Sequence, residues 1–154
     1  MEYRIENLDF ELRIVGKSKS VKTNKAATMI SQHWNKAKKE GFIQELKDLA
    51  WEDPKCTLES LLGVCGKEVL INDDEFDYFM GVRYDGEPPK DFETLVIPPC
   101  IWAVFPNVSE AWKALYSEWL PTADYRLANL PCIECYYPAK HKPRHELWVP
   151  VVPK

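Results

Sequence analysis

Two seven-residue stretches, FDYFMGV at residues 76–82 and HELWVPV at residues 145–151, decide the fold of this chain. Each is typical of a β-strand, and aligning them matches Asp77 with Glu146 and Phe79 with Trp148. An acid therefore stands two residues before an aromatic ring in both stretches. The surrounding elements recur as well. In each half a strand is followed by a helical segment and then by two strands, and the quoted stretch is the second of those two. The sequence predicts a duplicated strand-helix-strand-strand unit.

The first unit begins with alternating apolar and polar residues at 10–21, the period of a half-buried strand. Apolar residues at 26, 27, 30, 34 and 37 predict a helix that Thr23 or Asn24 could cap and Gly41 ends. A short second helix or a turn is expected within 42–51. Residues 58–65 and 76–84 predict an antiparallel pair of strands around a turn at 72–74.

The second unit follows the linker DGEPPKD at 85–91. Two short strands flank Pro98 and Pro99, because two prolines cannot sit together in a central strand. Helical spacing then predicts a helix that Ser109 caps and Pro121 stops. Strands at 130–138 and 145–153 complete the unit. We expect one domain over residues 1–154, made of half-repeats at about 1–84 and 93–152.

These elements predict an α+β fold with an antiparallel sheet, pseudo-twofold symmetry and a central ligand groove between the halves. The length of 154 residues fits one domain. A net charge of −4 would repel nucleic acid, and no apolar run is long enough to span a membrane. The five cysteines are an odd number, which favours reduced thiols and a cytoplasmic protein.

Cys132 and Cys135 have the spacing of a metal knuckle or a redox pair. The sequence holds no second pair of this kind, and strand alternation would point these two thiols to opposite faces. We therefore expect ordinary strand cysteines, no metal and no cofactor. Common catalytic signatures, such as a phosphate-binding glycine loop, are absent from the sequence.

Glu146 is an acid within a mostly apolar strand, where alternation places it on one face with Trp148 and Pro150. In one interpretation it lies on an edge strand and either faces water or pairs with Arg144 or Lys142. In the other it is a carboxylate among aromatic rings that attracts a cation or accepts a proton from water. Residue patterns alone leave both interpretations open.

Aromatic residues make up 12% of the chain, including six tryptophans. Rings at helical spacing are usually core, so we expect Trp112 and Trp119 to anchor the second helix. The remaining rings could line a groove, and rings around one carboxylate suit a flat, hydrophobic, cationic ligand.

Several stretches resemble the GyrI-like small-molecule-binding family: FDYFMGVRY, IPPCIWAVFPNVSEAWKALYSEWLP, LPCIECYYP and HELWVPVV. Members of that family occur alone and as effector domains of AraC-type and MerR-type regulators. The resemblance covers about residues 2–152 and implies the same duplicated fold. One departure is Pro106-Asn107-Val108, where the family often has a glycine-containing turn.

The resemblance implies that Glu146 is the central groove acid, because it matches the Glu-x-Trp-x-Pro motif. Trp102, and Tyr78 or Phe79, match aromatic positions that would line the groove. Trp34, Trp148 and Tyr137 are further candidates for its walls. We expect a stand-alone protein that binds hydrophobic, often cationic aromatic compounds and has no direct contact with nucleic acid or membrane.

Two alternatives remain. Some stand-alone relatives imply hydrolysis of cyclopropane rings in DNA-alkylating natural products, in which Glu146 would be the catalytic base. A protein that inhibits another macromolecule through its acidic surface is the third hypothesis.

Overall fold

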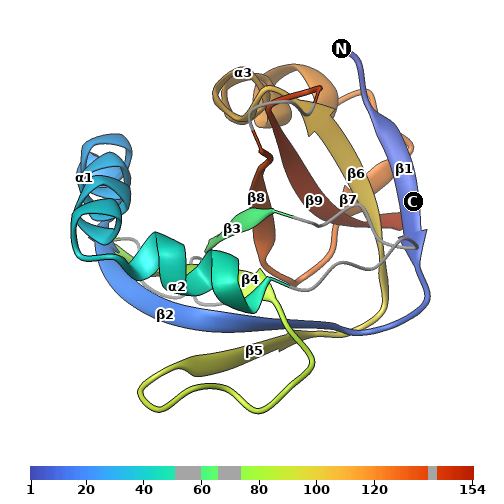
Figure 1. The fold of residues 1–154 in the computed structure, drawn as a ribbon. Coiled ribbons are helices and arrows are strands. Elements are labelled where there is room, and N and C mark those ends of the chain that lie inside the picture. The colour runs from blue at the N-terminus through green and yellow to red at the C-terminus, as the bar shows by residue number, and fades with distance from the viewer. Residues whose placement is uncertain (51–59, 66–73, 139–141) are drawn as a thin grey trace.

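The computed structural model describes residues 1–50, 60–65, 74–138 and 142–154 (Figure 1). Asn72 and Asp73 of the predicted turn, together with Cys56, lie outside the described residues. The first half contains β1 (Arg4–Leu8), β2 (Leu12–Lys22), a short 3-10 turn (Thr23–Lys25), α1 (Ala26–Lys39), α2 (Phe42–Leu49), β3 (Leu61–Cys65) and β4 (Glu75–Arg83). The second half contains β5 (Glu93–Ile97), β6 (Cys100–Pro106), α3 (Val108–Ala114), a π-helical turn (Leu115–Trp119), β7 (Tyr125–Leu127), β8 (Cys132–Tyr136) and β9 (His145–Pro153).

All these strands join one antiparallel sheet in the order β1-β6-β9-β8-β3-β4-β2-β5, with β7 paired to the end of β9. The order is symmetric about the β8–β3 pair. Phe79 lies opposite Val64, Trp148 lies opposite Ile133, and Val64 and Ile133 lie opposite each other. The duplicated fold with pseudo-twofold symmetry is thus confirmed, and the join between its halves is the β8–β3 pair.

The helices cover one face of this curved sheet. In Figure 1, α1 and α2 lie over the first half and α3 lies over the second, with an interval between them. α1 packs on β2, α2 on β4, and α3 on β6 and β9. Because the two helical groups cover different strands, the central β8 and β3 form a floor between them.

The buried core is divided into three clusters, two on the helical face of the sheet and one on its other face. Beneath α1 and α2 the buried side chains include Phe42, Leu46 and Met80, and beneath α3 they include Phe105, Leu115 and Trp119. A third cluster fills the inner curve of the sheet and holds no helical residue. It includes Trp102 and Trp148, whose rings meet edge to face with centroids 6.0 Å apart.

Local signals explain where the helices begin and end. Gly41 separates α1 from α2 with a φ of 80°, the left-handed region that glycine adopts without strain. α3 is capped by Asn107, whose side chain accepts a hydrogen bond from the Glu110 amide at 3.2 Å. The cap predicted at Ser109 was therefore wrong by two residues. The caps predicted at Thr23 or Asn24 were also wrong, because these residues lie inside the 3-10 turn.

Two short strands had not been predicted. β1 pairs with β6 at one edge of the sheet, and β7 pairs with the end of β9. β1 carries the exposed polar residues Arg4 and Asn7, and β7 has only three residues, two of them exposed, so neither shows the apolar pattern that marks the other strands. None of the helices in the described residues is long and apolar enough to cross a membrane.

Candidate functional site

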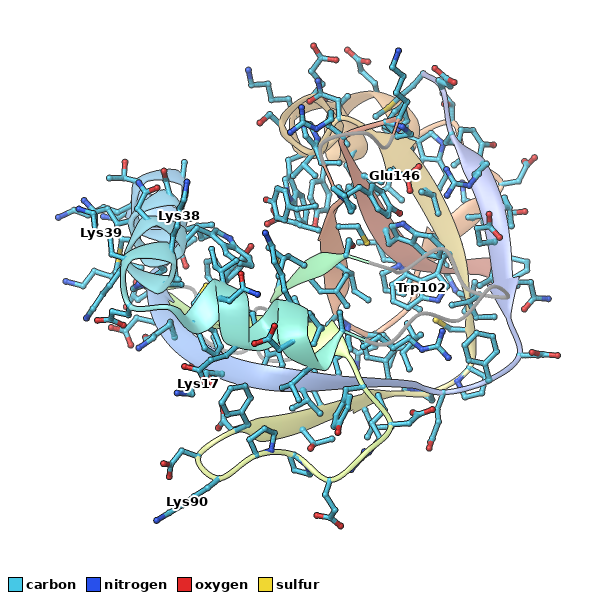
Figure 2. All side chains as sticks on the ribbon, in the orientation of Figure 1. Lys17, Lys38, Lys39, Lys90, Trp102 and Glu146 are labelled. Atoms are coloured by element: carbon cyan, nitrogen blue, oxygen red, sulfur yellow. The ribbon has the colours of Figure 1, made fainter. Side chains whose placement is uncertain are left out.

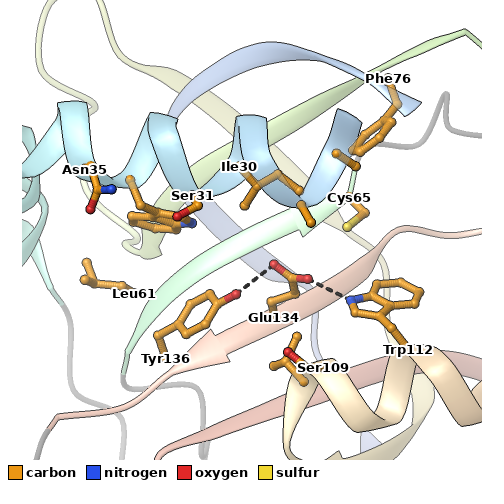
Figure 3. Close-up of a pocket in the computed structure, with 14 residues that line it drawn as sticks. Ile30, Ser31, Asn35, Leu61, Cys65, Phe76, Ser109, Trp112, Glu134 and Tyr136 are labelled. Carbon is orange, nitrogen blue, oxygen red and sulfur yellow. Dashed lines mark hydrogen bonds between the residues drawn. The ribbon is translucent and has the colours of Figure 1, made fainter. Parts of the chain in front are cut away.

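A pocket of about 730 Å³ lies between α1 and α3, with β3 and β8 as its floor. This volume is within the range of about 300–1,000 Å³ typical of small-molecule sites. Most of its exposed lining is apolar. The residues whose side chains define it are Ile30, Ser31, Trp34 and Asn35 of α1, Ser109 and Trp112 of α3, Leu61 and Cys65 of β3, Phe76 of β4, and Glu134 and Tyr136 of β8 (Figure 3). The site therefore lies on the axis that relates the two halves.

Glu134 is the acidic side chain at the floor of this pocket, and only 5% of its surface is exposed. Its Oε1 accepts hydrogen bonds from the hydroxyls of Tyr78 at 2.8 Å and Tyr136 at 3.0 Å. Its Oε2 accepts one from the Trp112 indole at 2.7 Å, and Figure 3 shows this bond and that of Tyr136. All three donors are uncharged. Among the described residues, no lysine or arginine forms an ion pair with Glu134.

The donors themselves are held in their protonated form. Burial raises the pKa of Tyr78 far above its ordinary value, and the Glu134 charge raises it further. The same two causes raise the pKa of Tyr136. Both hydroxyls therefore keep the proton that they donate. The Trp34 indole in turn donates to the Tyr78 oxygen at 3.0 Å, so a hydrogen-bonded chain joins α1 to β4 and β8.

The walls of the pocket are aromatic. The Trp34 ring meets the Tyr136 ring edge to face with centroids 5.8 Å apart. Trp112 stands on the opposite wall, on α3. Two indoles and a phenol therefore surround one carboxylate, an arrangement that can hold a cation by its charge and by contact with ring faces.

Glu146, the acid predicted for the groove, lies on the other face of the sheet. Glu134 is opposite Leu147 in the sheet, whereas Glu146 is opposite Cys135, so the two carboxylates point to opposite sides. Figure 2 shows Glu146 and Trp102 within the curve of the sheet, on the side of β1. Glu146 does not line the pocket, and its ligand contact stays a prediction.

The Glu146 carboxylate already has a cationic partner. It is 2% exposed and binds Arg4 of β1 through the two terminal guanidinium nitrogens, with Nη2 at 3.2 Å from Oε1. The Tyr137 hydroxyl donates to Oε1 at 2.6 Å. Burial by itself would raise the pKa of Glu146, but the hydrogen bonds from Arg4 and Tyr137 outweigh it and hold this pKa below its ordinary value. The charge at Glu146 is therefore balanced within the protein.

The other predicted residues divide between the two faces. Trp34 lines the pocket, and Tyr78 lies behind its floor in contact with Glu134. Phe79, Trp102, Trp148 and Tyr137 belong to the inner core cluster. Trp119 is buried in the core cluster beneath α3, as predicted. Trp112 is half-buried, packs against that cluster and also lines the pocket.

Glu134, Tyr136 and Cys65 were not predicted as site residues. The signal for Glu134 was an acid in the apolar strand CIECY, the same kind of signal that singled out Glu146. What the sequence did not show is which strand lies under the pocket. In the symmetric strand order, the first strand after the helices of each unit, β3 or β8, lies at the join between the halves, and Glu134 is on β8.

Comparisons with known proteins agree with this fold. In structure, the chain is similar to SAV2435 bound to tetraphenylphosphonium, with 20% identity and a TM-score of 0.77 over 99% of this chain and 94% of that one. It is similar to a Staphylococcus aureus MU50 protein named for bacterial transcription regulation, with 21% identity and a TM-score of 0.70 over 98% of each chain. An integron cassette protein of Vibrio cholerae matches with 12% identity and a TM-score of 0.56, over 99% of this chain and 95% of that one.

A comparison with curated protein sequences gives no significant match. The GyrI-like small molecule binding domain family matches residues 1–152, almost the whole chain. The chain therefore belongs to the family of GyrI-like small molecule binding domains.

Proposed function

We propose that this protein binds hydrophobic organic cations in the pocket between α1 and α3, with Glu134 as the counter-charge. The observation that carries this proposal is the buried Glu134 carboxylate, whose three hydrogen-bond donors are all uncharged. A buried charge without an opposite charge is costly, so a cation that enters the pocket gains an attraction that water screens only weakly.

The walls favour a cation of a particular kind. A compact, strongly hydrated cation would lose its water on entry and meet mostly apolar surface. A cation whose charge is spread over aromatic groups has less hydration to lose, and its rings can contact Trp34, Trp112 and Tyr136. Each cation–π contact would add about 0.5–2 kcal/mol. The tetraphenylphosphonium bound by SAV2435 is a ligand of this chemistry.

The test is a titration of tetraphenylphosphonium against the wild type and two matched variants, Glu134→Gln and Glu146→Gln. Both substitutions remove one charge and keep the shape of a buried side chain, but on opposite faces of the sheet. We expect Glu134→Gln to weaken binding at least about tenfold, equal to about 1.4 kcal/mol. Glu146→Gln should bind within about twofold of the wild type. The reverse order would assign the role to Glu146 and refute the proposal.

A neutral ligand that carries three phenyl rings on phosphorus, in place of the four of tetraphenylphosphonium, supplies a second control. Triphenylphosphine oxide should bind the wild type and Glu134→Gln equally, because it carries no net charge to attract. If both ligands lost the same affinity, the substitution would have changed the shape of the pocket rather than its charge. Hydrolysis of cyclopropane rings stays a prediction of the family resemblance.

A further inference from the structure

Cys65 and Cys132 lie directly opposite each other where β3 joins β8. Residues opposite each other in antiparallel strands have Cα atoms about 4.5–5.5 Å apart. A disulfide spans Cα separations of about 4.4–6.8 Å, so this pair is within reach of one without a rearrangement of the strands. Opposite residues also share a face of the sheet. Both thiols are free in the structure and half-buried.

The shared face is the one that carries the pocket. Cys65 lines the pocket, as Figure 3 shows, and Cys132 lies two residues before Glu134 on the same side of β8. Cys135 points to the inner core and is fully buried. Cys100 lies on β6, whose neighbours in the sheet are β1 and β9. Among the described cysteines, Cys65 and Cys132 are thus the pair that can be joined within the sheet.

We propose that Cys65 and Cys132 form a disulfide across the pocket floor, and that a bound cation controls the access of oxidant to it. The control of oxidant access by a cation rests on the proposed function. The formation of the disulfide rests on the strand register and is independent of any ligand.

The oxidant is a low-molecular-weight disulfide, RSSR. The thiolate of Cys65 attacks one sulfur of RSSR, which forms a mixed disulfide and releases RS⁻. The thiolate of Cys132 then attacks the Cys65 sulfur and releases the second RS⁻. Two electrons pass from the cysteines to RSSR, and the two thiol protons leave with the two RSH molecules. Cys65 is the first nucleophile because it lines the pocket through which RSSR enters.

The surroundings make this oxidation slow and its product durable. Burial raises the pKa of Cys65 well above its ordinary value, with the Glu134 charge as the next cause. Burial and Glu134 raise the pKa of Cys132 to about 12. Few thiolates are present at neutral pH, so attack on RSSR is slow. Thiols of high pKa are also poor leaving groups, so the disulfide resists reduction once it has formed.

The first experiment incubates the intact chain with oxidised glutathione and no ligand, blocks free thiols, and maps the peptides by mass spectrometry. We expect a linked peptide that contains Cys65 and Cys132, with the loss of two hydrogens and no glutathione retained. Cys65→Ser and Cys132→Ser should each abolish this link, whereas Cys100→Ser should leave it unchanged. A link to Cys56, Cys100 or Cys135 instead, or glutathione adducts alone, would overturn the proposal. The wild-type map decides this even if a serine variant fails to fold.

The second experiment repeats the oxidation with saturating tetraphenylphosphonium. We expect formation of the disulfide to slow at least tenfold in the wild type, and to slow much less in Glu134→Gln at the same concentration. If tetraphenylphosphonium binds but gives no protection, the control by the ligand is refuted. If direct titration shows that it does not bind, the proposed function and this control fail together, and the disulfide stands on the peptide map alone.

Discussion

At the scale of single residues, Gly63 provides the space in which the Tyr78 hydroxyl reaches Glu134. A Cβ at position 63 would lie 1.8 Å from the Tyr78 hydroxyl oxygen and 2.5 Å from the ring carbon that bears it. Gly63 lies opposite Glu134 in the sheet, so Tyr78 crosses over the glycine to donate to the carboxylate. The absence of a side chain here is therefore a feature of the site.

Gly63→Ala should consequently destabilise the protein by about 1–3 kcal/mol, the usual cost of overpacking a core. It should also weaken the binding of cations, because Tyr78 must leave Glu134. Urea unfolding and the tetraphenylphosphonium titration measure the two effects. Tyr78→Phe in the Gly63→Ala background removes the atom of closest approach and should restore part of the lost stability. Additive losses in the double variant would show that the two residues do not meet.

The ion pair between Arg4 and Glu146 makes the free energy of unfolding depend on pH. The folded-state pKa of Glu146 is lowered, so its contribution is present above the ordinary carboxyl range and is lost as pH falls through the lowered value. In Arg4→Met only uncharged donors, such as the Tyr137 hydroxyl, would still oppose the burial of Glu146, so this pH-dependent stabilisation would be smaller.

We therefore expect Arg4→Met to cost about 1–3 kcal/mol at pH 7, less than a fully buried pair because the Arg4 side chain is 42% exposed. The difference from the wild type should shrink as the pH falls below the ordinary carboxyl range and through the lowered pKa of Glu146, because the carboxyl then becomes neutral. Unfolding curves in urea at several pH values measure it. Arg4→Lys keeps the charge and should lie nearer to the wild type. A difference that does not change with pH would mean that Arg4 acts by packing alone.

At the scale of elements, the start of α3 decides where Trp112 stands. Asn107 has a φ of 66° and accepts a hydrogen bond from the Glu110 amide, so it both turns the chain and caps the helix. The backbone amide of Val108, the residue after Asn107, donates to Nδ1 of His145 at 2.9 Å, and this bond fixes the start of the helix to β9. Trp112 follows one turn later and reaches Glu134 from this fixed start.

Asn107→Ala should lower stability by about 1–2 kcal/mol, because it removes the cap and places alanine in a left-handed conformation. Asn107→Gly should lose less, since glycine adopts this conformation without strain. Ser109→Ala is the matched control and should change the melting temperature little, because Ser109 does not cap the helix. A larger effect at Ser109 than at Asn107 would contradict the capping observed in the structure.

At the scale of the whole molecule, the symmetric order of strands creates the site. The two units join through β3 and β8, and each unit brings its helices to the same face of the sheet. The helices cannot both cover the joining strands, so the floor between them stays open. Glu134 interrupts the symmetry there, because the register places it opposite Gly63 on β3. One carboxylate therefore faces a pocket that both halves build.

The sequence by itself determined much of this molecule. Alternation located β2, apolar stretches located β3, β4, β8 and β9, and helical spacing located α1, α2 and α3. A seven-residue repeat and the matching order of elements predicted the duplication. These predictions succeeded because the period of apolar residues is set by local backbone geometry. Caps and short edge strands were missed, since β1 and β7 are held by hydrogen bonds to distant strands rather than by an apolar pattern of their own.

Only the tertiary structure decided which buried glutamate faces the pocket. Alternation shows that residues share a face within one strand, but the pairing between strands decides which face that is. Glu134 and Glu146 lie on adjacent strands, and the β8–β9 register turns them to opposite sides. Arg4, which balances Glu146, lies 142 residues away in the sequence. Glu146 therefore has a charged partner, Arg4, whereas Glu134 has only uncharged donors, because the fold places different residues next to each carboxylate.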